Sequence, residues 1–243
     1  MKNVVFLIMA FFITNSANAQ FSFGGEAGLN FFNATQKIQT IGISSFENNK
    51  GSYRAAGKIG GFVNFLVKNR LDLRTGIYYS MKGFRNLTFN RNVIIFEDRY
   101  KWDANINYLE IPLNIFLRIV KTKKIYFGPG AYFGYGIGGK VRITTYAWGQ
   151  ESTEEKQIKF GEVSRDEIYD FRRCDYGVQL SAGYHLTNNL FIQAQYSQGL
   201  ANTLPTIAGA ANTDVYKNWG MTFSAGWNIE SGRKSAAVQT SDN

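Results

Sequence analysis

The chain has 243 residues, a formal net charge of +9 and 44% hydrophobic residues, with 25 glycines, 20 phenylalanines and 14 tyrosines. This length fits one domain, and the single cysteine, Cys174, excludes an internal disulfide. The lysines and arginines are dispersed and form no basic block, so the positive charge does not predict nucleic-acid binding.

Residues 1–19 have the pattern of a secretory signal peptide. Lys2 precedes the apolar run from Val4 to Ile13, and Ala17-Asn18-Ala19 has the small residues of a cleavage site. A first transmembrane helix is the alternative, but roughly ten apolar residues are too few against the ~20 that a helical span needs. We therefore expect residues 1–19 to be removed on export.

Residues 21 to 31 alternate between apolar and polar side chains with a period of two. Phe21, Phe23 and Leu29 share one face, while Glu26 and Asn30 lie on the other. Such alternation predicts a β-strand with one apolar face. The same pattern recurs at about 53–67, 70–84, 104–120, 125–146, 172–187, 190–201 and 218–229.

The connections between these eight runs alternate in length. Those at 68–69, 121–124 and 188–189 are short, and the other four are roughly fifteen to twenty-five residues long. In an antiparallel sheet with an even number of strands, all short turns then lie on one rim, as in outer-membrane barrels. The sequence therefore predicts an all-β fold over residues 20–230, an eight-stranded antiparallel transmembrane β-barrel with short periplasmic turns and four long extracellular loops. Residues 231–243 are expected to form a flexible periplasmic tail.

The stretch GYGIGGK at 134–140 matches both G-x-G-x-x-G and the start of a P-loop. A nucleotide site would need a helix after these glycines. Residues 141–146 are β-branched, aromatic or basic and favour a strand instead. We therefore interpret the glycines as part of the barrel wall, where they make room for large lumen side chains such as Tyr108 or let the strand bend.

Four stretches resemble the PorT-type small outer-membrane β-barrel family of Bacteroidota. They are Gly76-Ile-Tyr-Tyr-Ser-Met-Lys-Gly-Phe84, Asn107-Tyr-Leu-Glu-Ile-Pro-Leu113, Asp175-Tyr-Gly-Val-Gln179 and Gln195-Tyr-Ser-Gln-Gly-Leu200. The resemblance covers the mature chain in order, and Asn-Tyr-Leu-Glu-Ile-Pro is its most specific piece. It implies an eight-stranded barrel in a Gram-negative outer membrane. It implies little about activity, since most members have no assigned function, although the namesake is associated with protein secretion through the type IX pathway.

If the apolar face meets lipid, the polar face fills the lumen. The predicted lumen charge network consists of Glu26, Lys58, Asp72, Arg74, Glu110 and Arg118. Buried charges must be paired, so Arg74 or Lys58 are expected beside Glu26 and Glu110. Such a network would close the bore of so narrow a barrel. An open channel for small solutes is the alternative.

Strand direction places a second set of cations toward the long-loop mouth. This predicted electropositive mouth consists of Arg54, Lys82, Lys140, Arg142 and Arg173, with Lys140 and Arg142 pointing inward. It would attract an anionic partner, such as a lipopolysaccharide phosphate or an acidic polypeptide. The alternative is that the acids of residues 151–170 fold over the mouth and neutralise it.

The long loop at about 84–103 carries a candidate contact site for another protein, the apolar run Val93, Ile94, Ile95 and Phe96. An extended hairpin above the membrane is the alternative interpretation of this segment. The loop at about 147–171 is the second loop expected to contact partners.

The residue types needed for catalysis are scarce. His185 and Cys174 are the only histidine and cysteine, so a transition-metal site is not expected. Ser181 lies about 13 Å from His185 along the same predicted strand, too far for a hydrogen bond. We expect no catalytic residue and no cofactor, and a hydrolase that uses Glu26 or Glu110 is the least favoured alternative. The predicted function is a non-enzymatic structural or accessory component of an envelope or secretion assembly in the outer membrane, with lipid, lipopolysaccharide included, and envelope proteins as partners.

Overall fold

The computed structural model describes residues 20–37, 51–68, 70–93, 96–119, 124–161, 170–205 and 215–230. Eight long strands are β1 (Gln20–Lys37), β2 (Ser52–Lys68), β3 (Leu71–Val93), β4 (Phe96–Arg118), β5 (Ile125–Ala147), β9 (Cys174–His185), β10 (Leu190–Gly199) and β11 (Val215–Glu230). Three shorter strands are β6 (Gln150–Gln157), β7 (Lys159–Phe160) and β8 (Asp170–Phe171). The predicted signal peptide and C-terminal tail lie outside the described residues.

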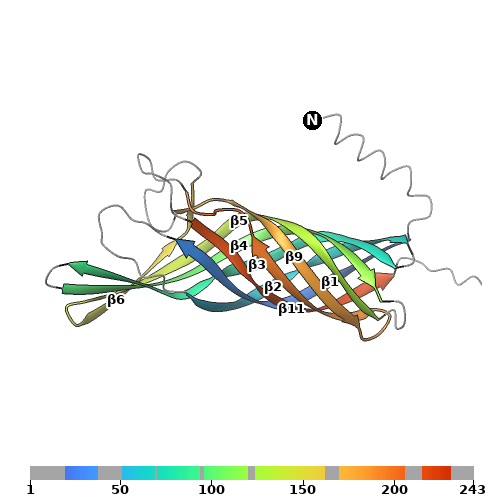
Figure 1. The fold of residues 1–243 in the computed structure, drawn as a ribbon, viewed down its shortest axis with the longest axis horizontal. Helices are drawn as coiled ribbons and strands as arrows, with labels where there is room; N and C mark the ends of the chain where they lie inside the picture. Colours follow the sequence, from blue (N-terminus) through green and yellow to red (C-terminus); the bar gives the residue numbers. More distant parts are fainter. Residues whose placement is uncertain are drawn as a thin grey trace, which may run out of the picture.

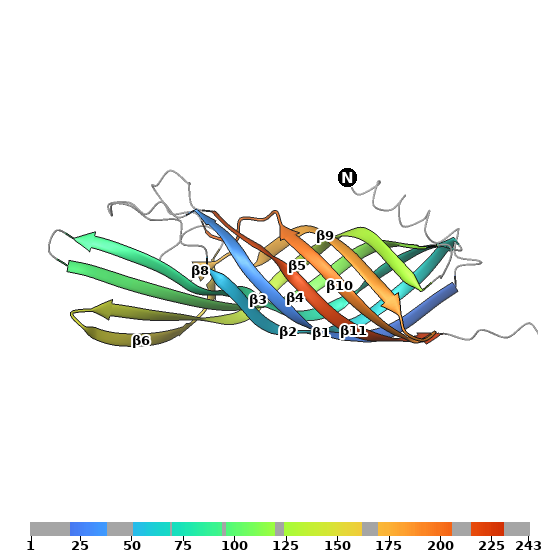
Figure 2. The same ribbon diagram turned by 60° about the horizontal axis from the view of Figure 1, so that its bottom comes forward.

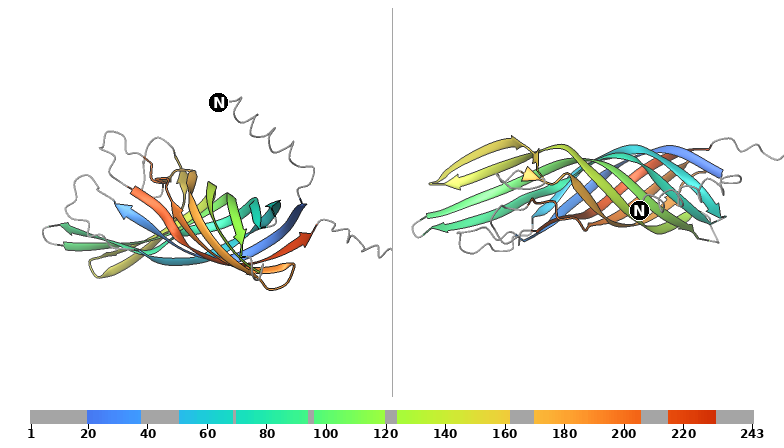
Figure 3. Two further views of the ribbon diagram at one scale, coloured as in Figure 1. Left: turned by 45° about the vertical axis from the view of Figure 1, so that its right-hand side comes forward. Right: turned by 90° about the horizontal axis from the view of Figure 1, so that it is seen from above.

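The eight long strands close into an antiparallel barrel. They follow the order β4-β3-β2-β1-β11-β10-β9-β5, and pairing between β4 and β5 closes the ring. First and last strands are neighbours, with Ala27 opposite Ala225. The strands run obliquely around an elongated body (Figures 1 and 3). The predicted fold, an eight-stranded antiparallel barrel, is therefore confirmed.

The alternation of side chains separates an apolar outer wall from a polar lumen. On β4, Leu109, Ile111 and Leu113 are 40–51% exposed, whereas their neighbours Glu110 and Asn114 are buried. The same alternation on the other strands makes a continuous apolar belt, which lipid must cover because an apolar surface of this extent is not left in water. None of the described residues forms a helix long and apolar enough to cross a membrane.

Strands β3 and β4 continue far beyond the barrel. Their pairing resumes at Leu87 and Trp102 and runs to Val93 and Phe96, so the long connection at 84–103 has the form of an extended hairpin. Strand β5 continues in the same way and pairs with β6, from Lys140 to Ala147. Together β3, β4, β5 and β6 form a sheet that projects from the long-loop side (Figure 2), which we call the extracellular sheet.

A β-bulge on β5 marks the start of this sheet. Tyr108 pairs with Gly136 but the preceding Asn107 pairs with Gly138, so β5 has one extra residue. An extra residue exchanges the two faces of a strand. Before the bulge the even-numbered residues of β5 face the lumen, whereas beyond it Val141 is buried and Lys140 is exposed. The expectation that Lys140 and Arg142 point into the lumen therefore does not hold.

Candidate functional site

The middle of the lumen holds a cluster of buried ion pairs. The Lys82 ammonium nitrogen lies 2.7 Å from a Glu110 carboxylate oxygen and 3.3 Å from an Asp175 carboxylate oxygen. The Lys58 nitrogen lies 3.6 Å from the other oxygen of Glu110. All four side chains are at most 3% exposed. These contacts connect β2, β3 and β4 to β9 across the bore.

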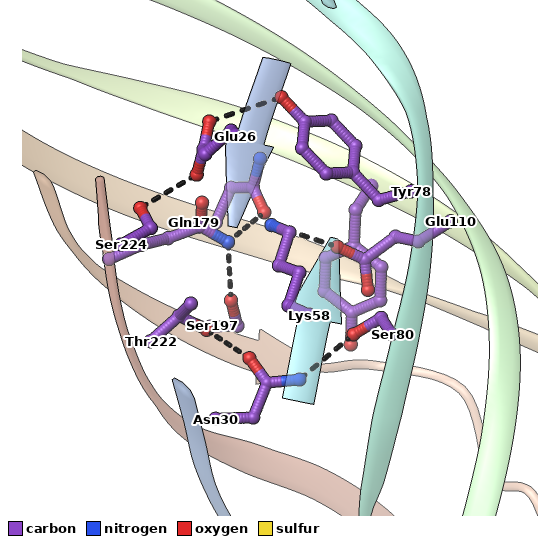
Figure 4. A network of polar contacts seen from close by, with 12 residues as sticks. Glu26, Asn30, Lys58, Tyr78, Ser80, Glu110, Gln179, Ser197, Thr222 and Ser224 are labelled. Carbon is purple, nitrogen blue, oxygen red and sulfur yellow. Dashed lines mark hydrogen bonds and ion pairs between the residues drawn. The ribbon is translucent and has the colours of Figure 1, made fainter. Parts of the chain in front are cut away.

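Glu26, on β1, is held by three neighbours. The Tyr78 hydroxyl donates a hydrogen bond of 3.1 Å to one carboxylate oxygen, and the Ser224 hydroxyl donates one of 2.7 Å to the other (Figure 4). The Arg74 guanidinium lies 4.0 Å away. The structure thus places Arg74 beside Glu26 and Lys58 beside Glu110, as the pairing argument expected.

Arg74 lies within a cage of four aromatic rings. Its guanidinium carbon is 4.5 to 5.6 Å from the ring centroids of Phe62, Phe116, Tyr126 and Phe191. The planar guanidinium also donates hydrogen bonds of 2.6 Å to Asn64 and 3.2 Å to Gln193. This combination of ring stacking and fixed hydrogen bonds suits arginine and not lysine. The cage lies in the short-turn half of the lumen, and its four rings belong to one buried cluster.

Charges in the middle of the lumen balance. Three buried cations, Lys58, Arg74 and Lys82, face three buried carboxylates, Glu26, Glu110 and Asp175. Burying charges is tolerable only when they are paired, and here the described partners satisfy that condition. Nearer the short-turn rim, Arg118 lies 2.6 Å from Asp72 and its side chain is 34% exposed.

Amides and hydroxyls fill the space between the ion pairs. Asn30 donates a hydrogen bond of 3.1 Å to the Ser80 hydroxyl and accepts one of 2.7 Å from Thr222. Gln195 donates one of 2.8 Å to Gln179. These bonds link β1 to β3 and β11, and β10 to its neighbour β9 (Figure 4). The polar face predicted from alternation is thus used for hydrogen bonds between strands.

An apolar cluster closes the long-loop end of the bore. Three residues from outside the eight long strands pack against barrel residues: Ile158, which follows β6, Phe171 on β8 and Leu204, which follows β10. The barrel contributes Ala34, Phe84, Ala104, Ile106, Tyr108, Val141 and Tyr216. A Cβ at Gly134 would make only an ordinary 3.4 Å contact with the Tyr108 ring, whereas a Cβ at Gly136 would collide with the Phe160 ring. The aromatic cage, the network of ion pairs and amides in the middle of the lumen, and the apolar cluster together fill the lumen with side chains.

The five cations of the predicted electropositive mouth do not come together. Lys82 lies deep in the lumen, and Arg54 is partly buried. Lys140 and Arg142, on the extracellular sheet, both contact Glu155, at 2.7 and 3.2 Å. Hydrogen bonds from Lys140 and then Arg142 hold the pKa of Glu155 below its ordinary value.

The fifth cation of that set, Arg173, packs on aromatic rings instead. Its guanidinium carbon lies 5.6 Å from the ring centroid of Tyr135 and 5.1 Å from that of Phe160. Arg173 also anchors the chain, since its carbonyl accepts a 2.7 Å hydrogen bond from the Gly136 amide. It therefore joins β5 to the segment before β9.

The predicted apolar contact site falls at the tip of the β3–β4 hairpin. The backbones of Val93 and Phe96 are paired, whereas Ile94 and Ile95 lie outside the described residues. The segment thus has the extended-hairpin form that was the alternative to a contact loop.

Sequence reasoning misjudged the depth of two lumen residues. Lys82 and Asp175 were both expected to face the lumen at the level of the mouth, yet the two lie 3.3 Å apart in the centre of the charge network. The alternation of side chains along β3 places Lys82 on the same face as Asp72 and Arg74. Alternation identifies the face of the strand, but the depth of a residue in the lumen depends on strand tilt and register.

No arrangement typical of metal binding or nucleophilic catalysis is evident in the described part of the chain. The His185 ring packs on Tyr126 and Phe191, with ring centroids 5.1 and 6.0 Å away. No group of three or more His, Cys, Asp or Glu side chains that could hold a metal ion occurs among the residues described above.

Fold and lumen together define a closed transmembrane β-barrel with a side-chain-filled bore. The sequence model of the outer membrane protein beta-barrel domain matches residues 15–204, so the chain belongs to this family and is an outer-membrane protein. Comparison with curated proteins gave no match.

Solved barrels of similar fold have little sequence in common with this chain. Ail, the attachment invasion locus protein of Yersinia pestis, is 10% identical with a TM-score of 0.42, covering 86% of this chain and 99% of Ail. Neisserial surface protein A is 11% identical with a TM-score of 0.39, covering 85% of this chain and 97% of the other. OprG from Pseudomonas aeruginosa is 11% identical with a TM-score of 0.35, covering 88% and 97%. Likeness at this level of identity concerns the fold alone.

Proposed function

We propose that this protein is a non-enzymatic component of an envelope or secretion assembly, similar to the PorT-type family, with a barrel that anchors an extracellular contact surface. The observation that carries this proposal is the filled lumen, in which cross-bore ion pairs and an apolar cluster occupy the space that a solute would need. The barrel then offers its outer wall, its rims and the extracellular sheet for function. Export by cleavage after Ala19 is part of the proposal.

The small-channel alternative needs a water-filled path past Lys82, Glu110 and Asp175. These side chains are at most 3% exposed and lie between the aromatic cage and the apolar cluster. Opening such a path would separate buried opposite charges, which is costly. We therefore favour a sealed anchor over a channel.

The hydrolase alternative needs a carboxylate that reaches a substrate. Glu110 is occupied by Lys82 and Lys58, while Glu26 accepts hydrogen bonds from Tyr78 and Ser224. A general acid or base must lie within hydrogen-bond reach of the reacting group. Both carboxylates are instead buried and engaged in structural contacts, which supports a non-enzymatic role.

The proposed partners are outer-membrane lipid, lipopolysaccharide included, around the apolar belt and other envelope proteins at the extracellular sheet. An electropositive mouth that draws in an anionic partner receives less support. Glu155 engages both Lys140 and Arg142, so part of that charge is neutralised within the protein.

The direct test is affinity purification of the tagged full chain from native outer membranes. The matched variant replaces residues 87–102 of the β3–β4 extension by an Asn-Gly turn, which leaves the barrel strands in place. We expect an envelope protein to co-purify in stoichiometric amount with the wild type and to be lost with the shortened variant. Recovery of the barrel alone from wild-type membranes would contradict the proposal.

A further inference from the structure

The lipid-facing wall of the barrel carries a groove on one side. It has a volume of about 740 Å³ and extends over β1, β11, β10, β9 and the start of β5, which are neighbours in the sheet (Figure 2). Its floor consists of the small outward residues Ala182, Ala194 and Ala225, of which Ala182 and Ala194 lie opposite each other. Larger outward side chains surround this floor, namely Leu29, Ile125, Tyr184, Ile192 and Phe223. The wall is thus hollowed where alanines take the place of large outward residues.

The groove has the size and the lining of a ligand site. Its volume lies within the range of ~300–1,000 Å³ that is typical of small-molecule pockets, which are likewise lined mostly by apolar side chains. The polar lining residues Gln193 and Ser224 belong to the lumen, where they bind Arg74 and Glu26. The groove therefore offers a mainly apolar surface to its ligand.

A cation lies at the short-turn end of the groove. Lys124 is exposed and directly precedes Ile125, which lines the groove opposite Tyr184. The Lys124 carbonyl accepts a 2.8 Å hydrogen bond from the His185 amide, which holds the Lys124 backbone beside β9. Among the residues that the structure describes, no carboxylate forms an ion pair with Lys124. A lysine at the edge of the apolar belt can reach the level of the lipid headgroups, where it attracts anionic groups.

We propose that the groove binds an acyl chain of a phospholipid from the periplasmic leaflet, with the lipid phosphate at Lys124. The groove is continuous with the apolar belt that lipid covers, and its cation lies at the short-turn, periplasmic rim. An acyl chain is narrow and flexible and can follow a concave wall, whereas a second barrel would present a convex wall that does not fill it. The inference deepens the proposed lipid partnership and does not depend on the accessory role.

The test measures lipid binding by native mass spectrometry of the full chain, purified from outer membranes and freed of lipid in detergent. The probes are dipalmitoyl phosphatidylglycerol and dipalmitoylglycerol, which has the same acyl chains without the phosphate. Ala182→Leu/Ala194→Leu fills the groove from the lipid side, and Lys124→Gln removes the cation. Ala131→Leu changes an exposed alanine of β5 outside the groove and serves as the control. Heat-dependent mobility on gels verifies that every barrel is folded.

We expect the wild type and Ala131→Leu to bind phosphatidylglycerol equally. The variant with the filled groove should bind it roughly tenfold more weakly or worse, because the acyl chain loses its apolar contact. Lys124→Gln should weaken phosphatidylglycerol binding about fivefold, the usual effect of one lysine at an anionic membrane surface, and leave dipalmitoylglycerol binding unchanged.

Three results would overturn the inference. The first is a wild type that binds no phosphatidylglycerol, or binds it no better than the variant with the filled groove. The second is unchanged phosphatidylglycerol binding by Lys124→Gln, which would remove the phosphate from the site. The third is a wild-type dimer that the groove-filling substitutions dissociate, which would assign the groove to a second copy of the chain. Each of these results leaves the accessory function standing, because co-purification through the extracellular sheet does not involve the groove.

Discussion

Lys82 is the residue on which the lumen network depends most. It bridges Glu110 and Asp175, so it compensates two buried carboxylates from two strands. Asp175 also accepts hydrogen bonds from Tyr132 and Asn218, which do not neutralise its charge. Removing one member of a buried ion pair leaves an uncompensated charge in a medium of low dielectric.

Lys82→Gln should therefore lower the free energy of unfolding by ~3–5 kcal/mol, the usual cost of breaking a buried pair. The measurement is reversible urea unfolding of the barrel in lipid vesicles. Lys58→Gln is the matched control and should cost less, because Glu110 keeps Lys82 at 2.7 Å. If both variants unfolded at the wild-type urea concentration, the network would not stabilise the barrel.

At the scale of the elements, the bulge on β5 determines which residues the extracellular sheet presents. Gly139 has φ 155°, a conformation that other residues rarely adopt, and a Cβ there would collide with the Asn105 carbonyl oxygen on β4. The bulge turns Val141 inward against the apolar cluster and leaves Lys140 for Glu155. Gly139 thus lies at the junction between the barrel and the extracellular sheet and allows the backbone conformation found there.

Gly139→Ala should loosen the extracellular sheet and leave the barrel assembled. The expected local cost is about 1–3 kcal/mol, from the unfavourable backbone conformation and the clash. Limited proteolysis should then cleave the sheet faster than in the wild type. Gly57→Ala is the control, because a Cβ at Gly57 meets nothing within 4 Å and should leave the cleavage rate unchanged. Equal cleavage of both variants would contradict this role of the bulge.

The Glu155 contacts make the β5–β6 hairpin sensitive to acid. Lys140 and Arg142 lower the pKa of Glu155 from its ordinary value of 4.5. A lowered pKa in the folded hairpin means that the stabilisation is fully present above pH 4.5 and is lost as the pH falls through the folded value. NMR titration of the side-chain carboxyl should give a midpoint below 4.5 in the wild type and an ordinary midpoint in Lys140→Gln/Arg142→Gln. A midpoint in the wild type at or above 4.5 would show that the ion pairs do not form.

At the scale of the whole molecule, the barrel was predictable from the sequence and the interior pairing was not. A barrel wall has lipid on one side and a polar lumen on the other, so apolar and polar residues alternate along each strand. The faces of residues such as Leu109 and Glu110 can therefore be predicted from the sequence. The contact of Lys82 with Asp175 joins strands that are distant in the sequence, and it depends on tilt and register. The sequence left the segment at 84–103 open between a contact loop and an extended hairpin, and the bulge between Gly136 and Gly138 reversed the expected faces of Lys140 and Val141.

The central claim, a barrel sealed by its own side chains, is tested most directly by electrical recording from the purified full chain in planar lipid bilayers. The account predicts that the wild type inserts and gives no steady conductance above the bare membrane, because charge-paired and apolar layers fill the bore. Insertion is verified independently by the heat-dependent mobility of the folded barrel on gels. A steady, voltage-independent conductance from the inserted wild type would contradict the sealed lumen and favour the small-channel alternative.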